Sequence, residues 1–483
     1  MSSHALCLLV VASTSIAATH LVPAEFSTIQ AAVDASIDGD TVLVSPGTYT
    51  GKVDYLGKAI VLRSVSGASV TTLHVSSPCG PAVVIIRDAE GNGPAVLDGF
   101  TISSDSTSSG VYCENSDVVI TSNDLTENYA YPGCGAGIQC VSCSVILQDN
   151  HVFHNYMGGG AALQGCSGIV ANNEFVENES GMASSGWNGL GGALNVSGIG
   201  DTLTIRNNLF LRNSCASYYG YPYEAPGLGG AIRTSQITGR VLIVNDTFSG
   251  NRACFGGAIH ACPGVHVINC ILWDDASTSS EPGHGHEIYG PAVLSYSDVE
   301  QYANPDYVFD GVLGDGMISD TPMFVTGAYS AFELDELLSP CVDAGCTAPD
   351  CYDFEDPGDP GQALYPALGT ILNDMGAYGG GGVGYWVGIA GDPAIPVGGV
   401  SLSVFPNPCS SSFLIVFELS EPRTVDLRVY DVSGRRIGSV VAGEMPAGRR
   451  TAAVDDSGLL PGVYFCCLEA GEDTAVARIV LIR

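Results

Sequence analysis

The chain has 483 residues, which is enough for two or three domains, and 46% of them are hydrophobic, which suits a large core. It carries 51 acidic and 17 basic residues, a formal net charge of −34 at pH 7, and its only lysines are Lys52 and Lys58. Such a surface repels phosphate groups, so nucleic acid and anionic lipid are excluded as partners. With 62 glycines, 14% charged residues and many short strand-like runs, the composition favours an all-β protein.

The N-terminus resembles a secretory signal peptide. An apolar run from Ala5 to Ala12 is followed by the small-residue pattern Ser15-Ile16-Ala17-Ala18, although no Lys or Arg precedes the run. No later stretch is long and apolar enough to span a bilayer. Residues 1–18 are therefore predicted to be a signal peptide, and the protein is predicted to be secreted.

The 17 cysteines suit an oxidising compartment, which agrees with export. Two groups are spaced for local pairing: Cys140 with Cys143, and Cys341, Cys346 and Cys351 among themselves. Zinc binding is the alternative for Cys140 and Cys143, but the chain lacks a second ligand pair at finger spacing. The sequence does not fix the disulfide connectivity.

Residues 26–50 read as a short amphipathic helix followed by a strand. A helix at that place can cover the open end of a stacked β structure and prevent edge-to-edge association. We therefore expect this segment to begin the folded part of the chain.

The middle of the chain repeats one motif five times, with a weaker sixth copy. The copies are Asn123–Asn128, Asn150–Asn155, Asn173–Asn178, Asn208–Asn213, Asp246–Asn251 and Asn269–Asp274, with apolar anchors at Leu125, Val152, Phe175, Phe210, Phe248 and Ile271. The anchors are 27, 23, 35, 38 and 23 residues apart. A minimum spacing of 23 residues, with irregular additions, is typical of a stacked coil in which some turns carry inserted loops. The spacing predicts a parallel β-helix.

Each column of this alignment has a physical interpretation. The apolar anchors are expected in one interior row, with neighbours one coil apart, about 4.8 Å. The asparagines fit a corner, because Asn tolerates left-handed backbone and its amides can form a ladder between coils. Between the copies lie Gly-rich segments that predict a tight bend before a strand: Gly137-Ile138, Gly160–Leu163, Gly191–Leu194, Gly229–Ile232 and Gly256–Ile259.

A Gly-rich passage from Gly379 to Gly384, with Pro393 and Pro396, marks a linker. After it, alternating apolar residues and turn signals predict roughly seven short strands, typical of an immunoglobulin-like sandwich. The landmarks of this part are Phe405–Pro408, Val425–Asp431, Ser433–Arg435, Gly462–Tyr464 and Ile479–Arg483.

These features together carry two family resemblances. Residues 26–50, the repeats at 118–275, and the patterns Val293–Val299, Ser339–Gly345 and Asp374–Gly379 resemble secreted bacterial right-handed parallel β-helix proteins of the pectate-lyase-like superfamily. Residues 401–483 resemble the C-terminal sorting domains of the type IX secretion pathway, which implies the outer-membrane secretion machinery as a partner; the alternative is an ordinary accessory sandwich. The predicted organisation is a signal peptide at 1–18, a right-handed parallel β-helix at 19–379, a linker at 380–400 and an immunoglobulin-like sorting domain at 401–483.

Aromatic side chains concentrate in the insertions that follow the second asparagine of each copy. Such rings suit the faces and edges of sugars, and stacked over several coils they predict a polysaccharide-binding groove. The alternative is that they only pack their own loops against the coil. The candidates are Tyr129, Tyr131, Tyr156, Trp187, Tyr218, Tyr219, Tyr221 and Tyr223.

A second candidate site is a column of charged residues two places after the anchors: Glu127, His154, Glu177 and Arg212. Glu127 and Glu177 are expected roughly 10 Å apart, near the separation of an inverting glycosidase pair, with His154 between them. The alternative is that His and Arg alternate with carboxylates only to avoid like-charge stacking on a solvated strand. Asp124, His151 and Glu174 form a parallel column one place before the anchors.

The catalytic signatures of the related enzymes are missing from the sequence. No Lys follows Lys58 and no carboxylate-plus-Arg set of a lyase can be assigned, while Gly283-His284-Gly285 imitates polygalacturonases without their other elements in order. A separate acidic loop comprises Asp350, Asp353, Glu355, Asp356 and Asp359, and it either binds calcium or is simply solvated.

Two function classes remain. The first is a secreted or cell-surface protein, not an enzyme, whose β-helix displays a glycan-binding or adhesive face. The second is a polysaccharide lyase or glycoside hydrolase with a divergent active site. The missing signatures favour the first, and neither the glycan nor the fate of the C-terminal domain can be deduced from the sequence.

Overall fold

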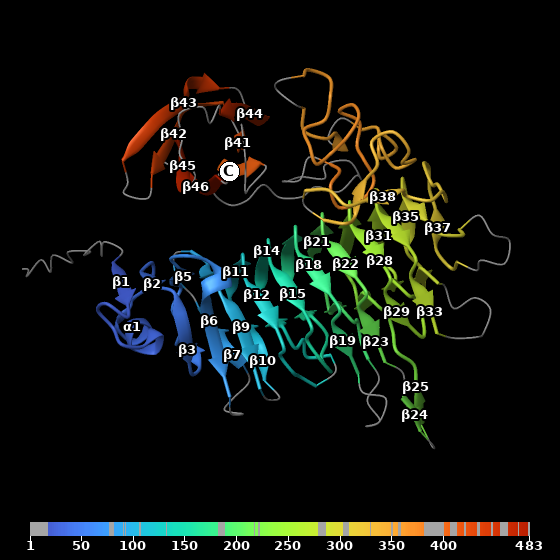
Figure 1. Ribbon diagram of the computed structural model, residues 1–483, viewed down its shortest axis with the longest axis horizontal. Helices are drawn as coiled ribbons and strands as arrows, with labels where there is room; N and C mark the ends of the chain where they lie inside the picture. Colours follow the sequence, from blue (N-terminus) through green and yellow to red (C-terminus); the bar gives the residue numbers. More distant parts are fainter. Residues whose placement is uncertain are drawn as a thin grey trace, which may run out of the picture. The chain divides into compact units, whose positions relative to one another are not determined.

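The structure is a computed structural model (Figure 1). It describes residues 18–76, 82–89, 91, 93–105, 108–131, 133–181, 189–216, 218–220, 223–278, 286–302, 309–328, 330–348, 351–355, 359–380, 400–405, 413–419, 422–431, 435–445, 448–454, 462–471 and 473–481. The predicted signal peptide therefore lies outside the described residues, apart from Ala18. The chain divides into two compact units, Met1–Glu355 with Gly361–Gly382, and Asp356–Pro360 with Val383–Arg483.

The first unit is a coil built from three long parallel sheets, counted over the described strands (Figure 1). The twelve-stranded sheet contains β1 (Thr19–Val22), β2 (Thr41–Val44), β5 (Val61–Ser64), β8 (Ala95–Asp98), β11 (Asp117–Thr121), β14 (Ser144–Gln148), β17 (Ser167–Ala171), β21 (Thr202–Arg206), β27 (Arg240–Val244), β31 (Val265–Ile268), β35 (Val293–Ser295) and β37 (Val312–Leu313). The nine-stranded sheet contains β4 (Val53–Asp54), β7 (Ala82–Arg87), β10 (Ser109–Glu114), β13 (Ile138–Val141), β16 (Ala161–Gln164), β20 (Leu194–Ser197), β26 (Ile232–Ser235), β30 (Ile259–His260) and β34 (Ile288–Tyr289). The ten-stranded sheet contains β3 (Gly47–Thr50), β6 (Thr71–Val75), β9 (Thr101–Ser104), β12 (Asp124–Thr126), β15 (His151–Phe153), β18 (Glu174–Val176), β22 (Leu209–Leu211), β28 (Thr247–Ser249), β32 (Ile271–Trp273) and β36 (Asp298–Val299).

Smaller elements extend this coil. A four-stranded parallel sheet contains β19 (Glu179–Ser180), β23 (Ser214–Cys215), β29 (Arg252–Ala253) and β33 (Ala276–Ser277). Two antiparallel pairs are β24 (Tyr218–Gly220) with β25 (Tyr223–Ala225) and β38 (Phe324–Val325) with β39 (Glu333–Leu334). A short 3₁₀ helix, η1, spans Ala68–Val70.

The predicted N-terminal helix is confirmed as α1 (Ile29–Ala35). Thr28 caps it by accepting a hydrogen bond from the Ala31 N–H at 3.2 Å, as a helix N-terminus requires. The buried side chains of the helix, Ile29, Ala32 and Val33, join the core of the coil. Figure 1 shows α1 at the end of the coil where the sheets begin.

The interior row of apolar anchors is confirmed for five coils. Leu125, Val152, Phe175, Phe210 and Phe248 are paired in register and fully or almost fully buried. The rings of Phe175 and Phe210 stack with centroids 5.1 Å apart, and those of Phe210 and Phe248 are 4.7 Å apart. The alignment of the sixth copy was wrong by one residue, because Phe248 pairs with Leu272 and not with Ile271.

Two buried asparagine ladders run along the coil, as the repeat predicted. The first ladder consists of Asn123, Asn150, Asn173, Asn208 and Asp246, and the second consists of Asn128, Asn155, Asn178, Asn213, Asn251 and Asp275. In each, the Nδ2 group donates to the Oδ1 atom of the next member, over 2.8–3.1 Å in the first ladder. The same Nδ2 groups also donate to backbone carbonyls; that of Asn178, for example, reaches the Val152 carbonyl of the preceding coil. The ladders thus satisfy buried polar groups between coils.

The prediction that these asparagines adopt left-handed backbone was wrong by one position. The left-handed residues precede the ladder members: Asp149 and Asn172 before the first ladder, and Glu127, His154 and Glu177 before the second, with φ between 50° and 55°. The asparagines can therefore point inward, while the residue before each of them turns the corner and faces outward.

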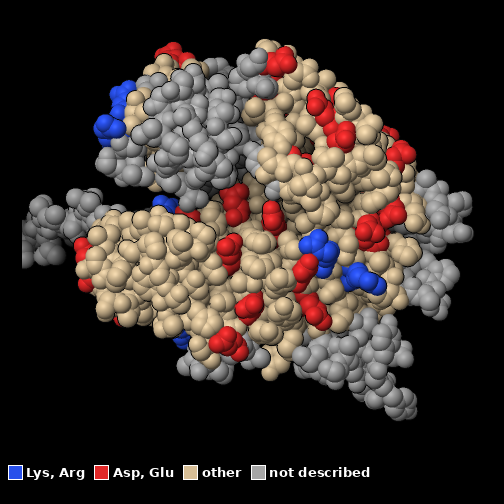
Figure 2. Space-filling view, viewed as in Figure 1, with Lys and Arg blue, Asp and Glu red and all other residues tan. Residues whose placement is uncertain are grey.

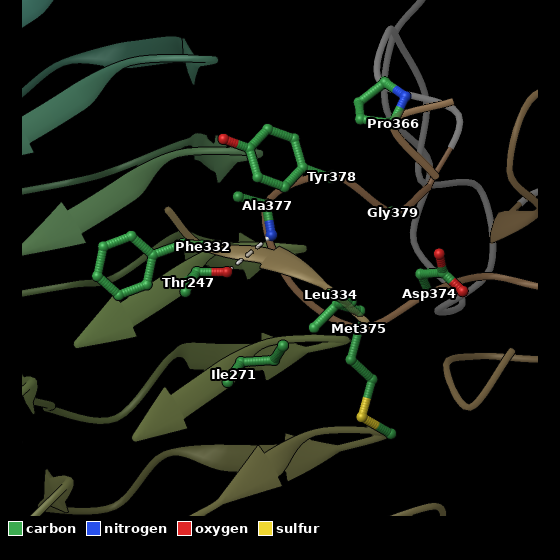
Figure 3. A pocket seen from close by; sticks show the side chains of 10 residues that line it. All are labelled: Thr247, Ile271, Phe332, Leu334, Pro366, Asp374, Met375, Ala377, Tyr378 and Gly379. Carbon is green, nitrogen blue, oxygen red and sulfur yellow. Dashed lines mark hydrogen bonds between the residues drawn. The ribbon is translucent and has the colours of Figure 1, made fainter. Parts of the chain in front are cut away.

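A return segment, residues 330–348, 351–355 and 361–380, crosses back over the outer face of the ten-stranded sheet. Leu209 and Leu211 of β22 are buried there against Ala377, and Ile271 of β32 is buried against Leu334 and Met375. Figure 3 shows the small pocket left where the segment meets β28 and β32, with the Thr247 hydroxyl accepting a hydrogen bond from the Ala377 N–H at 2.9 Å. On the earlier strands β12, β15 and β18, the side chains of the outer face are half-buried, whereas those of Leu209 and Leu211 on β22 are buried.

The second unit is a small antiparallel β domain with seven strands among its described residues, in agreement with the predicted sandwich. One sheet contains β40 (Val400–Phe405), β41 (Phe413–Leu419) and β44 (Gly448–Val454); the other contains β42 (Arg423–Asp431), β43 (Arg436–Met445), β45 (Gly462–Ala470) and β46 (Asp473–Leu481). Ile415, Phe417, Leu427, Leu468 and Ile479 are buried in its core.

Candidate functional site

Four charged residues follow successive strands of the ten-stranded sheet and form what we call the charge ladder. They are Glu127 after β12, His154 after β15, Glu177 after β18 and Arg212 after β22. Backbone hydrogen bonds join them to the next coil: the Glu127 N–H donates to the His154 carbonyl at 3.1 Å, and the His154 N–H donates to the Val176 carbonyl at 3.2 Å. Because each has left-handed backbone at the corner, their side chains leave the coil on the same edge.

The carboxylate of Glu177 forms hydrogen bonds with both neighbouring side chains, His154 and Arg212. Its Oε2 atom lies 2.9 Å from His154 Nε2, and its Oε1 atom accepts a hydrogen bond from Arg212 Nε at 2.7 Å. The hydrogen bond from Arg212 and then that from His154 lower the pKa of Glu177 below its ordinary value. The three side chains are 43–53% exposed, so this arrangement lies on an open edge. The lowered pKa favours the ionised carboxylate of Glu177, which does not suit a general acid.

The parallel column of Asp124, His151 and Glu174 is joined more loosely. His151 lies 3.9 Å from Asp124 and 4.0 Å from Glu174, and its ring stacks on Phe153 at 4.1 Å. Partial burial is the main cause that raises the pKa of Asp124. Histidine thus separates the two carboxylates, which is the arrangement expected where like charges would otherwise be stacked one coil apart.

Two of the predicted tyrosines lie beside the charge ladder. Tyr129 and Tyr156 pair one coil apart, and their rings stack with centroids 5.2 Å apart at 25°. Burial raises the pKa of Tyr156, and the nearby charges of Glu127, Glu179 and Glu177 raise it further. The tyrosine stack and the charge ladder therefore form one continuous surface. We call it the corner surface, and its members are Glu127, Tyr129, His154, Tyr156, Glu177 and Arg212.

The remaining aromatic candidates are not brought to this surface by any described contact. Tyr131 is 59% exposed. Tyr218, Tyr219 and Tyr223 lie on the β24–β25 hairpin, and their side chains lie outside the description, as do Trp187 and Tyr221 entirely. Their predicted role in glycan binding stays a prediction.

In the described part of the acidic loop, two carboxylates, those of Asp353 and Glu355, accept hydrogen bonds from backbone N–H groups. Asp353 is buried, and its carboxylate accepts hydrogen bonds from the N–H groups of Asp374 and Gly380. Glu355 and Asp359 are exposed, and Glu355 accepts a hydrogen bond from the Gly361 N–H at 2.8 Å. Asp350 and Asp356 lie outside the described residues. Over residues that are described, no group of three or more His, Cys, Asp or Glu side chains is arranged to hold a metal ion.

The late coils contain a pair of buried carboxyl groups that the sequence pattern did not reveal. Asp275 ends the second ladder, and the fully buried Glu287 precedes β34 in the column that Gly137, Gly160 and Ala258 occupy on other coils. Burial raises the pKa of Asp275 to about 7 and that of Glu287 well above its ordinary value, and the two carboxyl groups interact. Two adjacent buried carboxyl groups repel each other when both are ionised, so the pair retains a proton. The one-residue misalignment of the sixth copy hid Asp275.

Comparison with known proteins supports both units. Residues 58–272 match the model of the family described as right handed beta helix region, and residues 403–482 match the secretion system C-terminal sorting domain. No curated protein matches the chain. Among the described helices, none has the length and apolar character needed to cross a membrane. The chain therefore contains a right-handed β-helix region and a type IX secretion C-terminal sorting domain, which directs it to the cell surface or exterior.

Proposed function

We propose that the β-helix displays the corner surface to bind an extended glycan outside the cell, without cleaving it. The observation that carries this proposal is the continuity between the Tyr129–Tyr156 stack and the charge ladder. Stacked rings one coil apart offer flat apolar area to sugar faces, while the carboxylates and the Arg212 guanidinium offer partners for hydroxyl groups.

The charge of the chain favours a neutral glycan. The formal net charge is −34, and within the corner surface Glu177 already binds Arg212 and His154. A polyanionic sugar would need a basic groove or a bridging cation to approach such a surface. We therefore expect neutral plant or algal polysaccharides to bind better than pectate-like polymers.

Cleavage is the competing function, since Glu127 and Glu177 were predicted as a catalytic pair. Three features argue against it: the lowered pKa of Glu177, its hydrogen bonds to His154 and Arg212, and the exposure of the ladder on an open edge, whereas catalytic acids usually have raised pKa values in a cleft. The proposal therefore assigns these residues to binding.

Affinity electrophoresis of the full chain in gels containing single polysaccharides, with analysis of the products, tests the proposal. We expect retardation by at least one neutral polysaccharide and no shortened or unsaturated oligomers. Tyr129→Ala and Tyr156→Ala should each weaken binding about threefold to tenfold, the range expected for one aromatic contact. Tyr112→Ala on β10, in a different sheet, is the matched control.

Two results would overturn the proposal. Unchanged mobility of both tyrosine variants would remove the corner surface from binding. Oligomeric products that disappear in Glu177→Gln would instead identify a catalytic site at the same place.

A further inference from the structure

Cys346 and Cys351 bring their sulfur atoms together in the return segment. The two Sγ atoms lie 2.8 Å apart, and both residues are buried. A disulfide bond is about 2.05 Å long, so a small approach of the two atoms completes it. Five positions separate the two residues in the chain.

The third cysteine of this segment is held elsewhere. The Cys341 thiol donates to the carboxyl Oδ2 atom of Asp298 at 3.2 Å, and Cys341 is fully buried. Burial and the neighbouring Asp298 raise the pKa of the Cys341 thiol, which keeps it in the unreactive protonated form. Of the three cysteines, the geometry therefore selects Cys346 and Cys351 as the pair.

The backbones of both cysteines contact the asparagines that hold the return segment to the coil. The Cys346 N–H donates to Asn269 Oδ1 at 2.8 Å, and the Cys351 carbonyl accepts a hydrogen bond from Asn373. Asn245 joins these two asparagines, because its Oδ1 accepts from Asn269 and its Nδ2 donates to Asn373 Oδ1. A bond between the two sulfurs would fix the loop that presents both backbone groups.

We propose that Cys346 and Cys351 are joined by a disulfide bond in the exported protein, and that this bond secures the return segment to the coil. In forming it, the two thiols lose two protons and two electrons. The acceptor is the disulfide of a thiol–disulfide oxidant, which is reduced to a dithiol. The sorting domain supplies the context, since exported proteins leave the reducing cytosol. Because both sulfurs are buried once the segment has docked, the exchange takes place before docking is complete.

Peptide mapping of the exported full chain tests the bond directly. Thiols are first blocked with N-ethylmaleimide in denaturant, and the unreduced protein is then cut before aspartates. This cleavage places Cys341, Cys346 and Cys351 on separate peptides, residues 335–342, 343–349 and 350–352. We expect peptides 343–349 and 350–352 to be linked and peptide 335–342 to carry the blocking group. Blocked Cys346 and Cys351, or a link from either to Cys341, would overturn the proposal.

A stability measurement tests what the bond does. Cys346→Ser and Cys351→Ser should each lower the Tm by a few degrees without reductant, and prolonged reduction of the wild type should lower it equally. Cys262→Ser, at a half-buried position on another part of the coil, is the control, and its Tm should keep the wild-type response to reductant. A wild-type Tm that reductant does not change would show that the bond does not secure the segment. If a variant does not fold, the peptide map of the wild type still decides whether the bond exists.

Discussion

At the scale of single residues, Asp246 is the least expected member of the first ladder, because asparagine fills that position on the four preceding coils. Its Oδ1 accepts hydrogen bonds from the backbone and side chain of Asn208, at 2.7 and 2.8 Å, while its Oδ2 is buried without a partner among the described residues. Burial is the main cause that raises the pKa of Asp246 from 3.8 to about 8. Asp246 therefore carries a proton at neutral pH.

Replacing Asp246 with Asn should change the pH dependence of stability. Because the folded-state pKa lies above the unfolded value, the contribution of Asp246 to stability is fully present below about pH 4, falls as the pH rises toward about 8, and falls no further above it. Asp246→Asn should match the wild type near pH 4 and be more stable at pH 8, on the order of several kcal/mol, since a tenfold change in proton affinity is about 1.4 kcal/mol.

Urea unfolding of both proteins from pH 4 to pH 9 measures this difference. Asp117→Asn replaces an exposed carboxylate on β11 and serves as the control. Parallel pH profiles for wild type and Asp246→Asn would contradict the assignment of a buried, protonated Asp246.

Replacing Asn178 tests how much the second asparagine ladder contributes to the stability of the coil. The Asn178 side chain is fully buried, donates to Val152 and Asn213, and accepts from the backbone N–H and the Nδ2 group of Asn155. Asn178→Ala leaves several buried groups unpaired, so we expect the free energy of unfolding to fall by about 3 kcal/mol. Gln139→Ala, at a half-buried position of β13, should change it by less than about 1 kcal/mol in the same urea titration.

At the scale of elements, the coil is stable because each strand buries its apolar face against the strand one coil away. The stack of Phe175, Phe210 and Phe248 shows this most directly, since the rings are nearly parallel and only 1% exposed or less. One coil alone could not bury these rings, so the energy of the fold lies in the interfaces between coils.

Phe210→Ala should lower the free energy of unfolding by about 3–5 kcal/mol, because it removes the middle ring and leaves a cavity between two coils. Phe210→Leu retains most of the volume and should cost clearly less. Equal losses for the two variants in chemical denaturation would mean that ring packing does not stabilise this interface.

At the scale of the whole molecule, the two units have separate tasks. The β-helix carries the corner surface. The β domain carries the export signal, since its residues 403–482 match the sorting-domain family. Because the domain has its own buried core, its removal should leave the packing of the coil intact.

Deleting residues 401–483 should stop export. In a host with type IX machinery, we expect the full chain at the cell surface or in the medium and the truncated chain retained inside the outer membrane, as cell fractionation and immunoblotting would show. Full-length Glu177→Gln should be exported like the wild type. Truncated protein in the medium at wild-type levels would assign export to another part of the chain.

The sequence alone determined the coil, because the periodic apolar pattern fixes which strands pair. Leu125, Val152, Phe175, Phe210 and Phe248 could be aligned without coordinates, and the structure pairs them in that register. The pattern no longer predicts the register where the repeat itself changes, because Cys270 takes the ladder position after Asp246 while the asparagine lies one residue earlier, at Asn269.

Only the tertiary structure decided how the side chains outside the repeat are used. The sequence put Glu127, His154 and Glu177 on successive coils, but the binding of Glu177 to both His154 and Arg212 depends on side-chain conformations that no periodicity specifies. Likewise, no local signal shows that the return segment covers Leu209 and Leu211, since that contact joins residues far apart in the chain. Strand register follows from a repeating local pattern, whereas ion pairs and the cover of a sheet face are fixed by non-repeating, long-range contacts.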